Sequence, residues 1–276
     1  MHALVVGHGS EAERRASILT ALGHRPARAE ALDSGRFPLP DIALVCGPVD
    51  TRVDHAIKLL DLGVPAVFVE QPMAIDTARL DALEQACADA ITMTGCKLRF
   101  AYNFPRVRWA LFEMNCSKPL PLRLAVSQPR ARDRLEQTIH EFDLAFSLNG
   151  QMQAIHTVSR RTALQIGIEH SNLAWSHIEF DWTGRTPRGR ALLSAIDDGD
   201  ALTVPHQPEW VTPSHDYIAQ REEVAHFVAC AQTGGQPCCT ISSGRHVLES
   251  AIAAILRKDA PAAAGSDSIR SPAGSQ

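Results

Sequence analysis

A glycine-rich turn near the start of the chain has the residue pattern of a dinucleotide-binding loop. Residues 7–12 read Gly-His-Gly-Ser-Glu-Ala, which is G-x-G-x-x-A, and they lie between a predicted strand and a predicted helix. In such a loop the first glycine permits a tight turn, and the second lets the backbone approach a pyrophosphate at the helix N-terminus. A plain structural turn is the alternative. The residues predicted to bind the cofactor here are Gly7, His8, Gly9 and Ser10.

Acidic residues near this loop bear on which dinucleotide it would bind. Glu11 and Glu13 place negative charge in the first helical turn, where it stabilises the helix but does not favour a phosphate. A ribose-binding carboxylate is expected about 20 residues further on, at the end of the second strand. Only Glu30 lies near that distance, in a segment, 25–30, that has a poor strand pattern. Arg28 would favour a 2′-phosphate and Glu30 would repel one, so the choice between NAD and NADP stays open.

One histidine, His140, lies on a predicted helix next to an acidic residue. Glu136 lies four residues earlier on the same face of a predicted helix, where it can orient the imidazole. A structural or solvent-facing histidine is the alternative. A further histidine, His177, lies beside Glu179 on the polar face of a predicted strand, and a solvated face is the simpler interpretation there.

The remaining histidines, cysteines and arginines form no pattern typical of a metal site, and we predict no metal. His170, His206 and His215 are scattered without the spacing of metal ligands. The seven cysteines include no C-x-x-C pair, and we interpret them as buried or incidental thiols in a reducing cytosol. Two arginine-rich runs, 129–134 and 185–190, are predicted to be solvated loops, with binding of a substrate phosphate or carboxylate as the alternative.

The first part of the chain alternates short apolar strands with amphipathic helices. Strands are predicted at 3–6, 41–46 and 65–69, and helices at 11–22, 51–62 and 76–90. Strand–helix alternation at this spacing predicts a parallel sheet with crossover helices. The interval 23–41 is too short for the second strand, helix and third strand of a full dinucleotide fold.

The second part of the chain has a different pattern. Strands are predicted at 122–128, 174–182, 190–196 and 202–204, and helices at 135–148, 217–233 and 244–257. Residues 174–182 alternate a polar with an apolar face, which is typical of an antiparallel strand packed on one side. We therefore predict an α/β Rossmann-like N-terminal domain with a parallel sheet, followed by an α+β domain with a largely antiparallel open sheet. The predicted boundaries are 1–118 for the dinucleotide-binding domain, 119–259 for the substrate and oligomerisation domain, and 260–276 for a disordered tail.

Composition limits the classes of protein that remain. The 276 residues are 45% hydrophobic and 21% charged, which excludes disordered and coiled-coil proteins. A formal net charge of −4 argues against binding nucleic acid by bulk charge. The apolar run at the start is too short for a signal peptide or a membrane span, so we expect a cytoplasmic protein with no membrane partner.

Residues 41–90 resemble the Gfo/Idh/MocA oxidoreductases, the family of glucose–fructose oxidoreductase and inositol dehydrogenase. The shared features are a strand that ends at a proline, a helix followed by a glycine turn, and a strand that runs into a Glu-x-Pro motif. This resemblance implies four more cofactor-binding residues: Gly47, Pro48, Glu70 and Pro72.

Two later segments extend the resemblance over most of the chain. Residues 136–143 correspond to the family's Asp-x-x-x-His-x-x-Asp stretch, and 222–235 are similar to its late helix with a glycine turn. The resemblance implies a catalytic role for His140, Glu136 and Gln71. Gln71 stands in place of the lysine of the family's Glu-Lys-Pro motif, and a neutral amide can orient a carbonyl only through hydrogen bonds.

The resemblance implies NAD- or NADP-linked oxidation or reduction of a sugar, a polyol or a related small hydroxy or carbonyl compound by hydride transfer. The expected partners are a small-molecule substrate and further copies of the chain in a homo-oligomer, and no nucleic acid. Val49 stands where the family has Asn, and Arg52 where it has His. Together with Gln71 and the short interval 23–41, these departures favour the alternative of a non-redox enzyme, such as a lyase, or a ligand-binding protein that keeps the fold.

Overall fold

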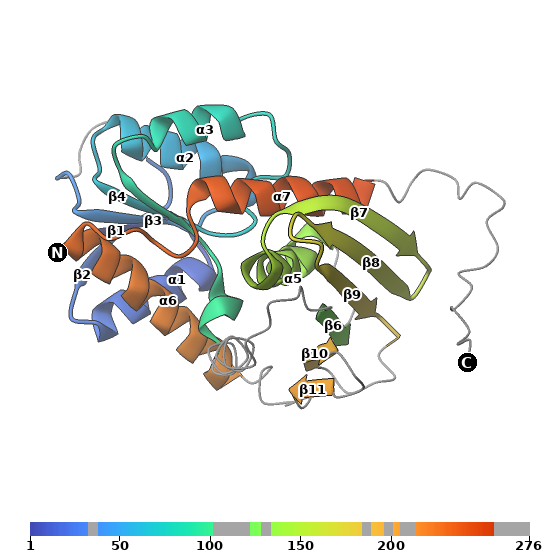
Figure 1. The fold of residues 1–276 in the computed structure, drawn as a ribbon. Coiled ribbons are helices and arrows are strands. Elements are labelled where there is room, and N and C mark those ends of the chain that lie inside the picture. The colour runs from blue at the N-terminus through green and yellow to red at the C-terminus, as the bar shows by residue number, and fades with distance from the viewer. Residues whose placement is uncertain are drawn as a thin grey trace, which may run out of the picture.

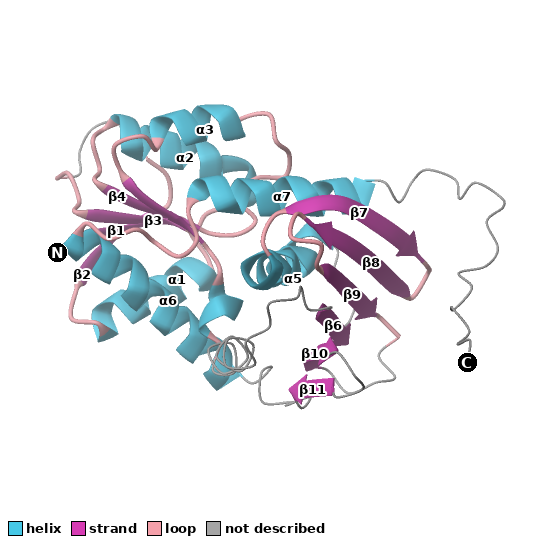
Figure 2. Cartoon of the chain, in the orientation of Figure 1, coloured by secondary structure: helices cyan, strands magenta, loops and turns pink. Residues whose placement is uncertain are grey.

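Two β-sheets, each covered by helices, lie side by side in the protein (Figures 1 and 2). The computed structural model describes residues 1–32, 38–101, 122–127, 134–183, 189–195, 201–204 and 213–256. Within these ranges, every helix is too short or too polar to cross a lipid bilayer.

The first sheet is parallel throughout, as predicted. Its strands are β1 (His2–Val6), β2 (Arg25–Ala29), β3 (Ile42–Val45), β4 (Ala66–Val69) and β5 (Ile91–Thr94), in the order β2-β1-β3-β4-β5. The connecting helices are α1 (Ser10–Ala21), α2 (Val49–Asp61) and α3 (Leu80–Ala86), and the 3₁₀ helix η1 (Lys97–Phe100) follows β5. The strands β3 and β4 are buried along their whole length, which explains their continuous apolar sequences.

The sequence interpretation of residues 25–30 was wrong, because Arg25–Ala29 form strand β2. This strand pairs in parallel with β1 and is the edge of the described sheet. A proline such as Pro26 is tolerated in an edge strand, and the backbone pairing does not require an apolar sequence. The interval 23–41 therefore contains the strand β2, and β2 is one edge of the sheet in the described part of the chain.

The helix predicted at 76–90 is also corrected, to the seven residues of α3. The Asp76 carboxylate accepts a hydrogen bond from the Ala78 N–H at 2.9 Å, so a local turn precedes the helix. Tight turns at 87–90 then lead into β5, a strand that the sequence pattern did not predict.

The second sheet is mixed and largely antiparallel, as predicted. Its strands are β6 (Leu122–Ser127), β7 (Met152–Ser159), β8 (Ala163–His170), β9 (Trp175–Asp181), β10 (Gly189–Ala195) and β11 (Ala201–Val204), in the order β11-β10-β6-β9-β8-β7. Only the neighbours β6 and β9 run parallel. Strand β9 buries one face and exposes the other as predicted, whereas β7 and β8 were not predicted.

Helices α5 (Arg134–Asn149) and α7 (Ile241–Leu256) cover the inner face of this sheet and pack on each other (Figure 1). Their apolar residues form one core with alternate residues of the strands. That core includes Ile139, Phe142, Ile166, Ile178 and Leu248, all of them fully buried. Helix α7 also contacts β5 and α3, so it joins the second sheet to the first.

Helix α6 (Pro213–Thr233) follows the second sheet in sequence but packs on the first sheet, beside α1 (Figure 1). The fully buried ring of Phe227 lies 5.8 Å, centroid to centroid, from that of Phe68 on β4. At the surface, Arg14 Nη1 donates to Asp216 Oδ2 at 2.8 Å. The half of the molecule that is built on the first sheet is therefore completed by a late segment of the chain.

The packing of α6 predicts that Phe227→Ala lowers the free energy of unfolding by about 3–5 kcal/mol, since a large buried ring is removed from the core. Urea unfolding followed by circular dichroism measures this loss. The matched variant Ile218→Ala, on the same helix but 48% exposed, should change stability by less than about 0.5 kcal/mol. Equal effects of the two substitutions would contradict the placement of α6.

Candidate dinucleotide-binding site

The loops that follow β1 and β3 meet at the carboxyl edge of the parallel sheet. Gly7 has a φ of 135°, and a Cβ at this position would lie 2.5 Å from the backbone nitrogen of Gly47. The Gly7 N–H donates to the carbonyl of Ala29 at 2.8 Å. Only glycine fits here, because both the backbone conformation and the contact with the next loop exclude a side chain.

The second glycine of the loop faces open space. Gly9 has a φ of 86° and precedes α1, and a Cβ here would have no atom within 4 Å. The first helical hydrogen bond runs from the Glu13 N–H to the Gly9 carbonyl at 3.1 Å, so the N–H groups of residues 10–12 lie at the helix N-terminus. His8 and Ser10 are exposed beside it. This cradle fits a pyrophosphate, which needs close backbone approach and helix N-terminal N–H groups.

The carboxylate of Glu11 turns away from this cradle. It lies 3.1 Å from Arg15 Nε and accepts a hydrogen bond from Gln220 of α6 at 3.3 Å. Burial and the neighbouring Glu70 raise the pKa of the Glu11 carboxyl. The negative charge that the sequence places in the first turn is therefore held against Arg15.

Glu30 lies where a ribose-binding carboxylate is expected. It follows the last residue of β2 and is exposed, and the hydrogen bond between Gly7 and Ala29 holds the end of β2 beside the glycine loop. Arg28 is directed toward Glu13, with its Nη2 3.8 Å from the Glu13 carboxylate. This placement puts an acidic group where a Rossmann-type site would hold the adenosine ribose of a dinucleotide.

Arg52 ties together the loops that follow β3 and β4. Its Nε donates to the Gly47 carbonyl at 2.8 Å, and its Nη1 donates to the carbonyls of Pro72 at 2.6 Å and Glu70 at 3.4 Å. Pro48, the N-cap of α2, is exposed at the same edge. Gly47, Pro48, Glu70 and Pro72 are thus brought together with the glycine loop.

The Glu70 side chain itself is buried and bound to Arg15. Arg15 has no exposed surface, and its Nη2 and Nε donate to Glu70 Oε2 at 2.6 and 3.0 Å. Its Nη1 donates to Glu223 of α6 at 2.6 Å. Glu223 also accepts the backbone N–H of Cys96. Glu70 therefore positions the loop that leads to Gln71 through this buried cluster of charges.

Gln71 is buried at the junction between the first sheet and α7. Its Oε1 accepts from the Met73 N–H at 3.1 Å. Its Nε2 has no hydrogen-bond partner among the described residues and lies against Gly244, where a Cβ would be 3.2 Å away. Thr94 Oγ1, at the same contact, is also buried without a partner in the described part of the chain. These polar atoms mark a place where a ligand or water would be stabilised.

The histidine predicted to transfer protons lies on α5, beyond the carboxyl edge of the first sheet (Figure 1). His140 is 9% exposed, whereas Glu136, one turn earlier, is exposed. One turn later, Asp143 forms a buried two-point ion pair with Arg99 of η1, at 2.5 and 2.8 Å. This pair fixes α5 against the end of the first sheet.

The other candidate residues are placed as follows. His170 is buried and structural, because its Nδ1 lies 2.9 Å from the Gly150 carbonyl and its Nε2 2.8 Å from Ser176 Oγ. His177 lies on the partly exposed face of β9. His206, Cys116 and most of both arginine-rich runs fall outside the described residues. Within the described ranges, no three His, Cys, Asp or Glu side chains are grouped as a metal would require.

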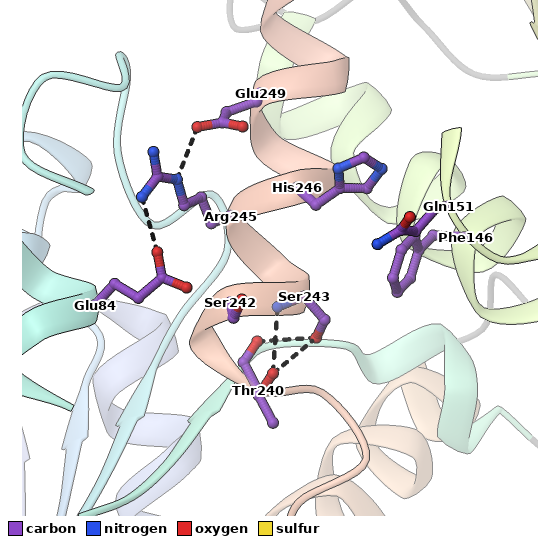
Figure 3. A pocket seen from close by; sticks show the side chains of 9 residues that line it. All are labelled: Glu84, Phe146, Gln151, Thr240, Ser242, Ser243, Arg245, His246 and Glu249. Carbon is purple, nitrogen blue, oxygen red and sulfur yellow. Dashed lines mark hydrogen bonds and ion pairs between the residues drawn. The ribbon is translucent and has the colours of Figure 1, made fainter. Parts of the chain in front are cut away.

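A cavity of about 430 Å³ lies between α3, the start of β7 and the first half of α7 (Figure 3). Arg245 on its wall is bound by Asp81, Glu84 and Glu249 at 2.6–2.8 Å. Three carboxylates around one guanidinium leave no positive charge for an anion. The full lining is Glu84, Phe146, Gln151, Thr240, Ser242, Ser243, Arg245, His246 and Glu249, none of which is a predicted site residue.

The sequence interpretation missed Arg15, Glu223 and the anchoring role of Arg52. A signal for Arg15 was present, because it lies on the same helical face as Ala12 and Ile18, where apolar residues are buried. The partner Glu223 lies some 200 residues away in sequence, and no spacing rule could have paired the two.

These features define a protein with a Rossmann-type dinucleotide-binding half and a second half built on an open sheet. Residues 4–96 match the Gfo/Idh/MocA family model, described as an oxidoreductase family with an NAD-binding Rossmann fold. The resemblance stated from the sequence is thereby confirmed, and the predicted cofactor class, NAD or NADP, agrees with that description.

Individual proteins show the same likeness. A myo-inositol 2-dehydrogenase from Thermotoga maritima is 29% identical over 126 residues. The matched region covers 41% of this chain and 37% of the length of that relative. A myo-inositol dehydrogenase structure from Corynebacterium glutamicum has a TM-score of 0.76 at 15% identity, covering 93% of this chain and 96% of that one. An oxidoreductase from Agrobacterium radiobacter, in complex with NAD+, L-tartaric acid and magnesium, has the same score and identity over 94% and 96%.

The buried charge cluster predicts a specific pH dependence of stability. Burial raises the pKa of Glu223 to about 7 despite the opposing effect of Arg15, and Glu70 adds to the rise. The folded state therefore binds a proton that the unfolded state releases near pH 4.5, and this contribution is lost as the pH rises toward 7. We expect the free energy of unfolding to decline over this range by up to about 1.4 kcal/mol per pH unit, the value for one proton.

Urea unfolding at pH 5, 6, 7 and 8 measures this slope. Glu223→Gln should make the slope shallower, because the Glu223 proton is gone, although Glu11, whose pKa burial also raises, keeps its own contribution. Glu222→Gln, at the exposed neighbouring position, should leave the slope as in the wild type. An unchanged slope in Glu223→Gln would show that another group carries the proton.

Proposed function

We propose that the protein is an NAD-dependent oxidoreductase that acts on a sugar, a polyol or a related small hydroxy or carbonyl compound. The observation that carries the proposal is the open glycine cradle at the N-terminus of α1, with Glu30 beside it. The named activities of the matched dehydrogenases support the substrate class. When bound, a nicotinamide would supply hydride transfer at its C4 position.

The chain's own residues would then have separate tasks. The N–H groups of residues 10–12 would bind the pyrophosphate, and Glu30 would accept the ribose hydroxyls and repel a 2′-phosphate, which favours NAD over NADP. His140 would move the proton of the substrate hydroxyl or carbonyl, with Glu136 and Gln71 as the other polar candidates. Gln71 can only donate a hydrogen bond through its Nε2, which has no partner in the part of the chain that the structure describes.

A non-redox enzyme or ligand-binding protein on the same fold is the second candidate. It is favoured by the burial of Gln71 against α7, since no ammonium group stands at this position to assist proton transfer. The two functions differ in whether a nicotinamide dinucleotide binds at all.

Titration with NADH and NADPH, followed by nicotinamide fluorescence, tests the proposal. We expect NADH to bind, and to bind more tightly than NADPH. Gly9→Ala should weaken NADH binding at least tenfold, because its methyl group occupies the space that the pyrophosphate needs.

Gly23→Ala is the matched control. Gly23 has a φ of 85°, close to the 86° of Gly9, and equally open surroundings, so neither substitution meets a neighbouring atom. Gly9 also has an extended ψ of −175°, a conformation nearly restricted to glycine, so circular dichroism checks that Gly9→Ala is folded. Gly23→Ala should retain wild-type affinity for NADH. Failure of both dinucleotides to bind at millimolar concentration would leave the non-redox function.

Turnover tests the roles of the polar residues. With a substrate found in a panel of polyols and sugars, His140→Ala should lower kcat by about 100-fold or more, the range for loss of a general acid–base. Gln71→Ala should lower it less than tenfold, since an amide carries no proton in the reaction. Equal small effects would show that proton transfer is assigned to the wrong group.

A further inference from the structure

Cys96 and the adjacent pair Cys238 and Cys239 are far apart in sequence but gather where the first sheet meets α6 and α7. Cys96 follows β5, and Cys238 and Cys239 lie in the connection between α6 and α7. The Sγ atoms of Cys96 and Cys238 are 4.0 Å apart, in van der Waals contact. Cys96 has no exposed surface, whereas Cys238 is exposed.

Backbone hydrogen bonds hold both thiols in place. The Cys238 N–H donates to His226 Nε2 at 3.1 Å, and its carbonyl accepts from Arg99 Nη1 at 2.6 Å. The Cys96 N–H donates to the buried Glu223. The contact between the two sulfur atoms therefore belongs to the folded structure on both sides of the junction.

The two thiols differ in reactivity. The hydrogen bond from Cys96, together with the charge of Arg99, lowers the pKa of Cys238 against the effect of partial burial. Burial raises the pKa of Cys96. Because the thiolate is the nucleophile, the exposed cysteine is suited to react first and the buried one second.

We propose that Cys96 and Cys238 are a redox modification site, at which a low-molecular-weight disulfide converts the two thiols into a reversible disulfide bond. The Cys238 thiolate attacks one sulfur of the small disulfide, so that an S–S bond forms to Cys238 and one small thiolate leaves. Cys96 then attacks Cys238 Sγ and expels the second small thiolate, which takes up the proton of Cys96. Two protein thiols are oxidised, and one small disulfide is reduced to two thiols.

Two neighbouring cysteines are less suited to be the second thiol. Cys239 is fully buried, and its Sγ donates to Asp143 Oδ1 at 3.6 Å while it also hydrogen-bonds Cys96. The Cys230 Sγ lies 3.6 Å from His226 Nε2, the atom that also binds the Cys238 N–H. Cys96 alone has its sulfur in contact with that of Cys238 among the described cysteines.

The bond would connect two parts of the nucleotide-binding half. Cys96 is joined through Glu223 to Arg15 and Glu70, and the connection that carries Cys238 follows α6. Oxidation at this place would therefore act on the cluster that positions the Glu70–Pro72 loop.

The test treats the native, fully reduced chain with oxidised glutathione and analyses it by intact mass and by peptide mapping without reduction. A Cys116→Ser background removes the cysteine outside the described residues. We expect the protein to lose two hydrogens and to yield a Cys96–Cys238 peptide pair, which dithiothreitol reverses. Cys96→Ser should instead retain one glutathionyl group on Cys238, and Cys238→Ser should leave Cys96 unmodified.

Cys87→Ser, at the partly buried thiol that caps the end of α3, is the control and should react as the parent does. Circular dichroism confirms that each variant is folded. A Cys96–Cys239, Cys238–Cys239 or Cys230–Cys238 bond would overturn the proposal, as would a stable glutathionyl adduct with both thiols present. Absence of reaction in the folded protein, when the urea-unfolded chain reacts, would overturn it equally.

Discussion

A single buried arginine connects the parts of the chain that build the nucleotide-binding half. Arg15 of α1 binds Glu70 at the end of β4 and Glu223 of α6, so three elements that are far apart in sequence share one charge. Removing one partner of a buried ion pair typically costs about 3–5 kcal/mol, because the remaining charge stays buried without compensation. Two buried carboxylates and the half-buried Glu11 surround one guanidinium, so the cluster has more negative than positive charge. Burial disfavours this excess charge and raises the pKa of Glu223, so that Glu223 keeps a proton to higher pH.

Around this cluster the loops of the carboxyl edge are held mainly by backbone groups. Gly7 packs directly on Gly47, and Arg52 binds three carbonyls in the loops after β3 and β4. Bonds to carbonyls do not depend on which side chain the accepting residue carries, so residues such as Gly47 and Pro72 are held by their backbone alone. This explains how the chain keeps the fold at 15% identity to dehydrogenase structures while Gln71 and Arg52 depart from the residues usual at their positions.

Much of this architecture was predictable from local patterns. Continuous apolar runs identified β3 and β4, and the alternation of β9 identified its buried face, because burial on two faces or one imposes those patterns. Strand β8 carries the same alternation and was overlooked, whereas β2 has no such pattern, since an edge strand is held by backbone pairing with β1. Helix α3 is short because a side chain–backbone turn at Asp76 precedes it, a local competition that periodicity does not report.

The candidate nucleotide-binding loop and Glu30 could be predicted from the order of residues alone. Both rest on local properties: a glycine pattern between a strand and a helix, and an acidic residue about 20 positions later. The roles of Glu70 and Glu11 could not be predicted, because both depend on Arg15 and on the return of α6. The contact of Cys96 with Cys238 likewise exists only after α6 and α7 have closed on the first sheet. Interactions between distant segments follow from packing, and packing is settled by the whole fold rather than by any one stretch of sequence.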